Sequence, residues 1–434
     1  MLGAALTVLA SAAIGIALPT IAIELGVSPS MSTWVVNAYL FATVVSLLPL
    51  AVIGDLYGHR RVFLAGVSLF GLASLSCAVA ELTPWPFATL LISRALQGLG
   101  AAGVMAVNMA LLRATHPLNR LGQGIGLNGM VVAATNALGP SVAGYILSTG
   151  TWQSLFAAFV APAAIAFFAG RASLPQTLRG IGKFDPVSAM LQAGAVAFFI
   201  LMLMGISNPN SLLALAASVG FGILFIRREL KSHDRLLPYE LLKNSLFIFS
   251  FSAAGASFVA QMMALIAIPF LLNAKLGMTN SAIGLAMTPW PLAAMVIAPF
   301  AGWLSDRLSP AAMGFGGLVL AACGLLGVSL LDRGTPFLYL AIPMATIGVG
   351  FAFFTGPNVR VLMLATPSHR SGAVGGLLAV SRQTGQLIGS AIAGIWLAQQ
   401  SIDVGSGHAV LTACVVAFFA AVLCLYKPKT ALIK

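Results

Sequence analysis

Two arginines stand in the middle of long apolar segments. Arg94 lies in the run 86–113, and Arg382 lies in the run 372–398. At 1.5 Å per residue, each stands roughly 15 Å along a helix and therefore near the centre of a bilayer. A guanidinium stays protonated and costs at least about 2.5–3.5 kcal/mol at that depth, so it needs a wet cavity or a polar partner. We expect both arginines to act on a transport pathway, or else to tie helices together through backbone carbonyls.

Neutral polar side chains on the same kind of apolar segment form a second group of candidates. They could line a pathway or bond helix to helix. Trp290 stands between two prolines that should kink its helix, and its indole could stack on an aromatic ligand. The candidates for substrate binding are Asn37, Gln97, Asn108, Asn128, Asn136, Gln261, Trp290, Asn358, Arg382, Gln383 and Gln386.

Acidic residues are absent from the middle of every apolar run. All ten Asp and Glu fall at the ends of runs or between them. The four cysteines have no CxxC spacing, the five histidines stand in loops or at run ends, and no GxxxxGK[ST] stretch is present. We therefore expect no enzyme, no cofactor and no metal site. A pathway with arginines and no acids suits lipophilic cations poorly.

The composition excludes a soluble protein. Of 434 residues, 59% are hydrophobic and 7% are charged, whereas a soluble domain carries roughly 25% charged residues. A soluble enzyme, a disordered chain and a secreted disulfide scaffold are excluded. The net charge of +12 reflects Lys and Arg gathered in alternate loops, so we read it as a topology signal and not as a nucleic-acid patch.

The apolar runs predict fourteen transmembrane helices, because about 20 apolar residues cross a bilayer. The basic loops all fall on one side of this topology, which places both termini in the cytoplasm of a multi-pass cell-membrane protein. The runs are 4–24, 33–53, 62–80, 86–113, 122–147, 152–170, 187–206, 210–227, 245–272, 280–304, 311–331, 336–364, 372–398 and 408–426.

The chain repeats itself at a shift of 250 or 251 residues. Gly98-Leu99-Gly100 falls on Gly348-Val349-Gly350, Asn108 falls on Asn358, and Asp55 falls on Asp306. The sequence therefore predicts an all-α membrane fold of two six-helix bundles in a parallel pseudo-twofold repeat. We expect an N-terminal bundle at 1–170, a linker with two extra helices at 171–243, and a C-terminal bundle with a short tail at 244–434. Transporters of this kind bind cargo near the midplane between their halves.

Several motifs resemble those of the major facilitator superfamily. The loop Gly54-Asp55-Leu56-Tyr57-Gly58-His59-Arg60-Arg61 is similar to its acidic-basic loop motif, and Gly302–Arg307 is the echo in the second half. Arg94–Ala102 resembles its motif B, and Gly139–Gly144 resembles the antiporter motif C. With Phe184-Asp185-Pro186 and Ser381–Gly385, the set resembles the branch of fourteen-helix drug:proton antiporters. The resemblance implies roles in proton coupling or gating for Arg94, Asp55, Gly58, Arg60, Gly139, Pro140 and Asp306.

One departure from that branch affects the coupling mechanism. The branch carries an Asp, a Thr and an Asn in its first helix, where this chain has Ala10, Ala12 and Gly15. The usual proton-coupling carboxylate is therefore missing. Because arginine hardly deprotonates, Arg94 would have to act through water or a neighbouring group.

The sequence favours a proton-coupled exporter of amphipathic organic compounds that works by alternating access. Its partners would be a small-molecule substrate, protons and the lipid bilayer, without nucleic acid, and we expect a monomer. One alternative is an exporter of an anionic metabolite, siderophore or lipid-like acid, with Arg94 and Arg382 as counter-charges. Another is a membrane scaffold or sensor without transport activity, suggested by Ala10.

Overall fold

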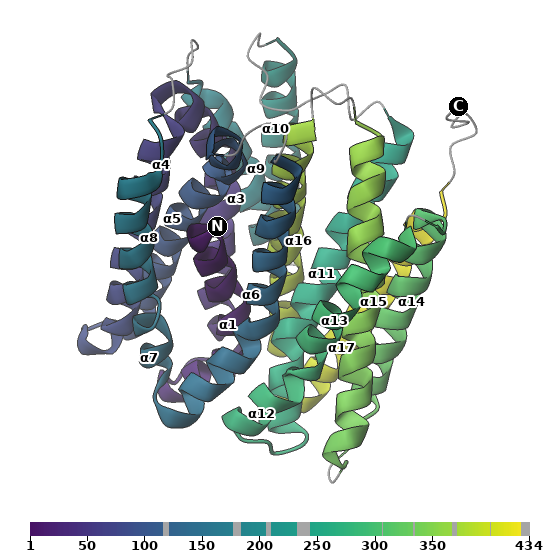
Figure 1. Ribbon diagram of the computed structural model, residues 1–434. Helices are drawn as coiled ribbons and strands as arrows, with labels where there is room; N and C mark the ends of the chain where they lie inside the picture. Colours follow the sequence, from purple (N-terminus) through teal and green to yellow (C-terminus); the bar gives the residue numbers. More distant parts are fainter. Residues whose placement is uncertain are drawn as a thin grey trace. The chain divides into compact units, whose positions relative to one another are not determined.

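The computed structural model describes residues 1–115, 121–176, 184–204, 210–231, 244–305, 307–332, 335–366, 371–399 and 401–426. These residues form helices joined by short loops (Figure 1). The helices are α1 (Leu2–Glu24), α2 (Pro29–Ser32), α3 (Trp34–Tyr57), α4 (His59–Ala78), η1 (Ala80–Leu82, a 3-10 turn), α5 (Pro86–Thr115), α6 (Leu121–Thr149), α7 (Trp152–Ala157), α8 (Val160–Ser173), α9 (Pro186–Met204), α10 (Asn210–Lys231), α11 (Ser245–Ala274), α12 (Asn280–Met287), α13 (Pro289–Ser305), α14 (Pro310–Ser329), α15 (Phe337–Leu364), α16 (Ser371–Gln399) and α17 (Ile402–Cys424).

Each predicted apolar run contains helix, because a backbone in lipid must satisfy its own hydrogen bonds. Twelve helical segments of the described residues are long and apolar enough to cross a membrane. The predicted total of fourteen spans is not confirmed by these twelve. The two long helices outside this set, α6 and α16, have 29 residues each, and both carry several amide or charged side chains.

Two predicted runs are interrupted. The run 280–304 breaks at Thr288, between α12 and α13, because Pro289 opens a new helix and cannot donate a backbone hydrogen bond. Trp290, which the sequence placed in mid-helix, therefore lies in the first turn of α13. The run 152–170 likewise divides into α7 and α8 ahead of Pro162.

The chain divides into two compact units. Unit 1 comprises residues 1–135 and 146–237, and unit 2 comprises residues 136–145 and 238–434. In unit 1, α5 packs on both α3 and α4, and α4 also contacts α8. In unit 2, α15 packs on both α13 and α14, and α14 also contacts α17. The same pattern of neighbours thus occurs in each unit.

Glycines bring the central helix of unit 1 against its neighbours. A Cβ atom at Gly98 in α5 would overlap the backbone carbonyl oxygen of Tyr39 in α3. A Cβ atom at Gly100 would lie 2.6 Å from the backbone nitrogen of Phe70 and 2.7 Å from the carbonyl oxygen of Gly66, both in α4. Since real Cβ atoms keep at least about 3.0 Å, only glycine fits at these two positions.

The same contacts recur in unit 2 at the shift seen in the sequence. Gly348 in α15 lies against the carbonyl of Trp290 in α13, as Gly98 lies against that of Tyr39. Gly350 lies against Gly317 and Ala321 in α14. The internal repeat is therefore present in the packing of the backbone as well as in the sequence.

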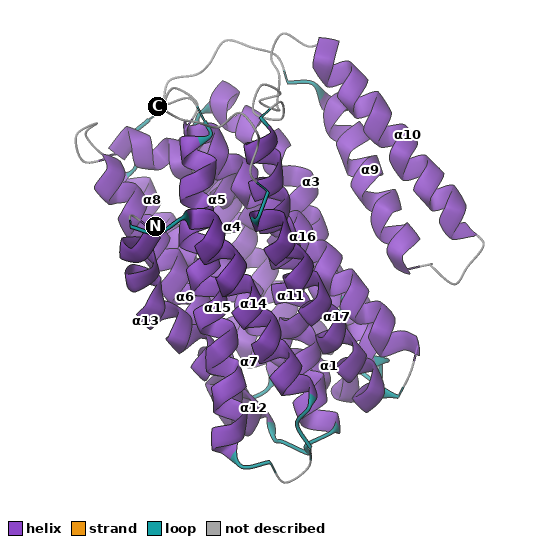
Figure 2. Cartoon of the chain, turned by 90° about the vertical axis from the view of Figure 1, so that its right-hand side faces the viewer, coloured by secondary structure: helices purple, strands orange, loops and turns teal. Residues whose placement is uncertain are grey.

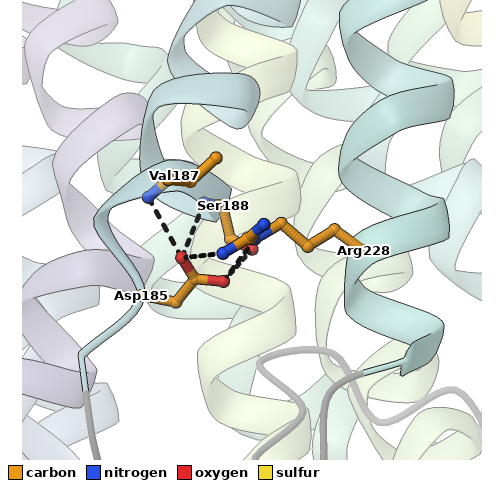
Figure 3. Close-up of polar contacts among 4 residues, drawn as sticks. All are labelled: Asp185, Val187, Ser188 and Arg228. Carbon is orange, nitrogen blue, oxygen red and sulfur yellow. Dashed lines mark hydrogen bonds and ion pairs between the residues drawn. The ribbon is translucent and has the colours of Figure 1, made fainter.

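The helices α9 and α10 form a hairpin that is clamped at one end (Figure 2). Asp185 caps α9 and accepts hydrogen bonds from the backbone N–H groups of Val187 at 3.1 Å and Ser188 at 3.3 Å. Arg228 of α10 donates to both oxygens of the same carboxylate, from Nε at 2.7 Å and from Nη2 at 3.0 Å (Figure 3). These bonds from Arg228 hold the pKa of Asp185 well below its usual range.

Substitution of the contact glycines should destabilise both units. We expect Gly98→Ala and Gly348→Ala each to lower the thermal midpoint of the purified protein, because overpacking a helix contact costs about 1–3 kcal/mol. Gly302→Ala and Gly316→Ala are matched controls, since a Cβ there meets open space and alanine favours helix. Equal midpoints for the two pairs of variants would contradict the packing described.

The clamp at Asp185 predicts a pH dependence of definite sign. Folding lowers the pKa of Asp185. The ionised carboxylate therefore contributes fully to the free energy of unfolding at a pH above the ordinary aspartate pKa of about 3.9, and this contribution is lost only as the pH falls below that value. We expect Asp185→Asn to lower the thermal midpoint by a constant amount from pH 8 to pH 5, with the difference narrowing below about pH 4. A difference that vanished between pH 7 and pH 5 would show that the pKa is raised instead.

Candidate functional site

Arg94 lies inside unit 1 with no exposed surface. Its Nε donates to the carbonyl oxygen of Val35 in α3 at 2.9 Å, and its Nη1 donates to Oε1 of Gln97, one turn along α5. Its Nη2 is buried without a hydrogen-bond partner among the described residues. The side chain therefore ties α5 to α3, which is the packing interpretation offered by the sequence.

Aromatic rings cover the guanidinium of Arg94. The ring of Tyr39 in α3 lies 4.4 Å from its central carbon, and the ring of Phe156 in α7 lies 5.8 Å away. The hydroxyl of Tyr39 donates to the carbonyl of Thr7 in α1 at 3.1 Å. A cation between ring faces in a desolvated site gains about 2 kcal/mol or more, so the rings offset part of the cost of burial.

A chain of hydrogen bonds leads away from Arg94 toward α4. Gln97 receives the bond from Arg94 and donates through Nε2 to the hydroxyl of Ser74 at 2.7 Å. Ser74 in turn donates to the carbonyl of Phe70 at 2.7 Å. Each residue in this series donates to the next, and the last bond ends on a backbone carbonyl. The aligned hydrogen bonds polarise one another and so help to stabilise the positive charge of the arginine. We call Arg94, Gln97, Ser74, Tyr39 and Phe156 the arginine cluster.

Ala10 and Ala12 are both buried in α1. The position of the missing carboxylate is thus occupied by a packed methyl group. Within the described part of the chain, no ion pair involves Arg94, and the ion pairs of unit 1 join Asp55 to His59 and Asp185 to Arg228. Dipoles and rings, in place of an acid, surround this charge.

Among the predicted amides of unit 1, Asn37 differs from the others. It is fully buried on α3, and neither its Oδ1 nor its Nδ2 has a partner among the described residues. Asn108 of α5 donates to Oδ1 of Asn128 in α6 at 3.3 Å. These two residues bond helix to helix, as many polar side chains in membrane helices do. The side chain of Asn136 lies outside the described part of the structure.

In unit 2, Trp290 packs in parallel on Phe351 of α15, with ring centroids 5.9 Å apart and planes 15° apart. The indole is 8% exposed, so most of its surface is already covered by protein. Asn358 donates to the carbonyl of Ser250 in α11 at 3.2 Å. Both predicted residues thus support packing within the unit.

The remaining candidates of unit 2 lie on α11 and α16. Gln383 is 3% exposed, whereas Gln261, Arg382 and Gln386 are partly exposed. Gly385 in α16 packs on the backbone of Gly255 in α11, which fixes the helix face that carries these residues. Roles in substrate binding remain predictions for all four.

The acidic-basic loop joins α3 to α4 through Gly58. This glycine has a φ of 103°, which side chains other than glycine rarely adopt. Asp55 lies 2.9 Å from Nε2 of His59 and stays 69% exposed. Arg60 donates to the carbonyl of Arg171 in the last turn of α8, so it caps that helix. Asp306, the counterpart in the second half, lies outside the described residues.

The antiporter-like segment makes a close helix contact within unit 2. A Cβ atom at Gly144 in α6 would lie 2.7 Å from the Cα atom of Gly284 in α12. Ala143, where the resembled motif has glycine, is fully buried, and Gly139 is buried as well. The side chain of Pro140 lies outside the described part of the structure. The segment therefore permits backbone contact between two helices.

Sequence reasoning missed three residues of the arginine cluster. Tyr39, Ser74 and Phe156 do not form a motif with Arg94, and they stand on three different helices. A signal for Tyr39 existed in the repeat, because Tyr39 aligns with Trp290 at a shift of 251. No comparable pattern marks Ser74 or Phe156.

Two helical units with repeated internal packing and many apolar spans define a membrane transporter and not an enzyme. The sequence matches the Major Facilitator Superfamily over residues 1–390, with a further match over 246–432. The chain belongs to this family.

Relatives and solved structures agree with this assignment. The chain is 38% identical over 427 residues to the uncharacterized transporter YebQ of Escherichia coli, covering 97% of this chain and 92% of YebQ. It is 28% identical over 400 residues to the riboflavin transporter RibZ of Clostridioides difficile, covering 92% and 87%. It is 28% identical over 417 residues to the tetracenomycin C resistance and export protein of Streptomyces glaucescens, covering 93% and 75%.

The fold is that of known transporters. A POT family transporter in complex with 5-aminolevulinic acid superposes with a TM-score of 0.73 at 15% identity, covering 97% of this chain and 93% of that one. The xylose transporter XylE from Escherichia coli in an inward open conformation gives a TM-score of 0.69 at 15% identity, covering 99% and 95%. At this identity the likeness concerns the fold alone.

Removing the guanidinium should loosen unit 1. We expect Arg94→Gln to lower stability by about 1–3 kcal/mol, because the carbonyl of Val35 and the amide of Gln97 lose a buried donor. Arg94→Lys should lie between wild type and Arg94→Gln. Arg61→Gln, on an exposed position of α4, is the control for loss of charge. Thermal unfolding in detergent measures these differences, and an Arg94→Gln variant as stable as the control would contradict the tie between α3 and α5.

Proposed function

We propose that this protein is a secondary exporter of amphipathic organic compounds that uses the proton gradient and works by alternating access. The observation that carries the proposal is the repeated set of glycine contacts, Gly98 and Gly100 in unit 1 and Gly348 and Gly350 in unit 2. Each set locks a central helix to both neighbours, so each unit would move as one body. Rigid-body movement of two halves is how such transporters expose a site to alternate sides.

The choice of cargo is supported by named relatives. They include a tetracenomycin C export protein, the multidrug resistance protein Stp of Mycobacterium tuberculosis and a riboflavin transporter. The Trp290–Phe351 stack is the aromatic pair of unit 2 that we propose to contact an aromatic cargo.

Proton coupling in this proposal does not use a carboxylate in α1, since Ala10 stands there. Arg94 would act through water, because its Nη2 has no partner among the described residues and a buried polar atom commonly binds an ordered water. Asp55 and its partner His59 place an acidic and a basic side chain in contact at the end of α3. Asp306 is the proposed counterpart in the second half.

The glycine pair Gly144 and Gly284 is the proposed gate. Helices that touch backbone to backbone exclude water and ions from the space between them, so this contact would limit leak while cargo crosses. Gly139 and Pro140 are the proposed gating residues beside this contact, where they would allow α6 to bend.

A second candidate cargo is an organic anion. It is favoured by the absence of acids from the middle of the apolar runs. Arg94 already contacts Val35, Gln97 and Tyr39. If the cargo is an anion, we therefore propose that Arg382 alone provides the positive charge that binds it. Arg382 is partly exposed on α16.

We further propose the topology expected from the sequence: fourteen spans with α6 and α16 included, both termini in the cytoplasm, and a monomer in the cell membrane. The proposed domains along the sequence are the bundles 1–170 and 244–434, with the hairpin α9–α10 on the linker 171–243. The gathering of Lys and Arg in alternate loops supports this orientation.

The test is uptake of a fluorescent planar dye into inverted membrane vesicles that contain the protein, with and without an imposed pH gradient. We expect uptake to rise with the gradient and to collapse when a protonophore is added, because export from the cell becomes uptake in this geometry. Arg382→Gln should leave uptake of a neutral dye nearly unchanged and should abolish uptake of an anionic dye if the second candidate is right.

Vesicles that contain Gly348→Ala should take up less dye than vesicles that contain the matched control Gly302→Ala, because only the first substitution disturbs the contact of α15 with α13. Empty vesicles provide the control for leak. Equal uptake by wild-type vesicles with and without the gradient would overturn proton coupling. Equal uptake by wild-type and empty vesicles for every dye would overturn the proposal of an organic-compound exporter.

A further inference from the structure

The outer face of α10 is open over its whole length. In the most apolar, membrane-length part of this helix only 6% of the residues are buried inside the protein, against 78% for α1. One strip of this face follows helical spacing and is exposed except for Gly220, which is partly exposed. The strip consists of Leu213, Ala216, Gly220, Leu224, Arg227 and Lys231.

The strip has a notch in its middle. A Cβ atom at Gly220 would meet nothing within 4 Å, and Ala216, one turn earlier, presents only a methyl group. Leu213 and Leu224 stand on either side, at 70% and 52% exposure. An extended alkyl chain could therefore lie along the helix backbone between two leucine side chains.

Two cations end the strip. Arg227 and Lys231 are four residues apart, so they project from the same face of the last turn. Neither has a partner among the described residues. Arg228, by contrast, is held by Asp185 of α9, and Glu229 is buried, so neither belongs to the open face.

We propose that this strip binds an anionic phospholipid, with the phosphate between Arg227 and Lys231 and an acyl chain along Gly220 and Ala216. The helix rises about 21 Å from Arg227 to Leu213, which is enough for one leaflet of roughly 15 Å. Paired cations at the membrane surface attract anionic headgroups. This site lies outside the proposed transport pathway and does not depend on it.

A second copy of this chain fits the strip less well. A twofold contact through α10 would place Arg227 and Lys231 of one copy against the same residues of the other, and like charges at one level repel. The helix dipole alone favours cations in the last turn but gives no reason for the notch at Gly220. Cations and notch together fit a lipid.

The experiment uses the full-length protein in a neutral detergent and measures the thermal midpoint with added phosphatidylglycerol, phosphatidylcholine or inorganic phosphate. We expect phosphatidylglycerol to raise the midpoint by about 2 °C or more and the other two to have little effect. Arg227→Gln/Lys231→Gln should lose the rise, whereas the control Arg61→Gln/Arg171→Gln, which removes two exposed cations from α4 and α8, should keep it.

Gly220→Leu tests the acyl chain separately, since a side chain there has room and fills the notch. We expect it to reduce the rise by at least half while the cations remain. Equal rises with phosphatidylcholine or inorganic phosphate, or a full rise in the Arg227/Lys231 double variant, would overturn the lipid site. If the Gly220→Leu variant keeps the full rise in thermal midpoint with phosphatidylglycerol, the placement of the acyl chain is wrong. If the wild-type protein forms dimers and Arg227→Gln/Lys231→Gln abolishes them, a second copy of the chain occupies the strip and the lipid site is overturned.

Discussion

Close contact between helix backbones is the constraint on which this structure depends. Lipid tails are as apolar as leucine, so helices in a bilayer gain little from hiding apolar surface and must gain from packing. In unit 1, Gly98 and Gly100 let α5 touch the backbones of α3 and α4, and Gly348 and Gly350 do the same for α15 in unit 2. Each central helix is therefore fixed to two neighbours at positions that admit no side chain.

The arginine cluster follows from this packing. Once α3, α4 and α5 lie backbone to backbone, the carbonyl of Val35, the ring of Tyr39 and the hydroxyl of Ser74 lie within reach of the side chains on α5. The cost of a buried charge is then divided among carbonyls, rings and an amide, and no acid is needed nearby. Arg94 can thus stay charged in a unit whose first helix has Ala10 where the resembled branch has Asp.

Much of the fold could be predicted from the sequence, because length, apolarity and repetition are properties of the chain itself. The shift of 250 residues aligns Gly98 with Gly348 by residue type alone, and the packing confirms their equivalence. The break at Thr288 was expected only as a kink, since proline marks a disturbance without saying whether the helix resumes. For Arg94 the sequence offered a pathway or a tie. The sequence alone does not distinguish a pathway residue from a tie between helices, because the partners Val35, Ser74 and Phe156 are distant along the chain and belong to no motif.

Motif resemblance was informative in a different way. Asp185 belongs to the tripeptide Phe184-Asp185-Pro186, which resembles a segment of the family. In the structure Asp185 caps α9 and binds Arg228 of α10. Arg60 was expected to be a gating residue, and in unit 1 it caps the end of α8. A motif marks where residues matter, whereas the partners that explain why come only from the fold.

We propose that each of the two compact units moves as a rigid body. Spin labels at Tyr57→Cys and Arg113→Cys, on the exposed ends of α3 and α5, measure a distance within unit 1 when the native cysteines are replaced by serine. The distance should be one narrow distribution, unchanged by pH between 5 and 8 and by transported dye. A broad distribution, or a shift of several ångströms on adding dye, would show that α3 and α5 separate and would contradict rigid-body movement of the unit.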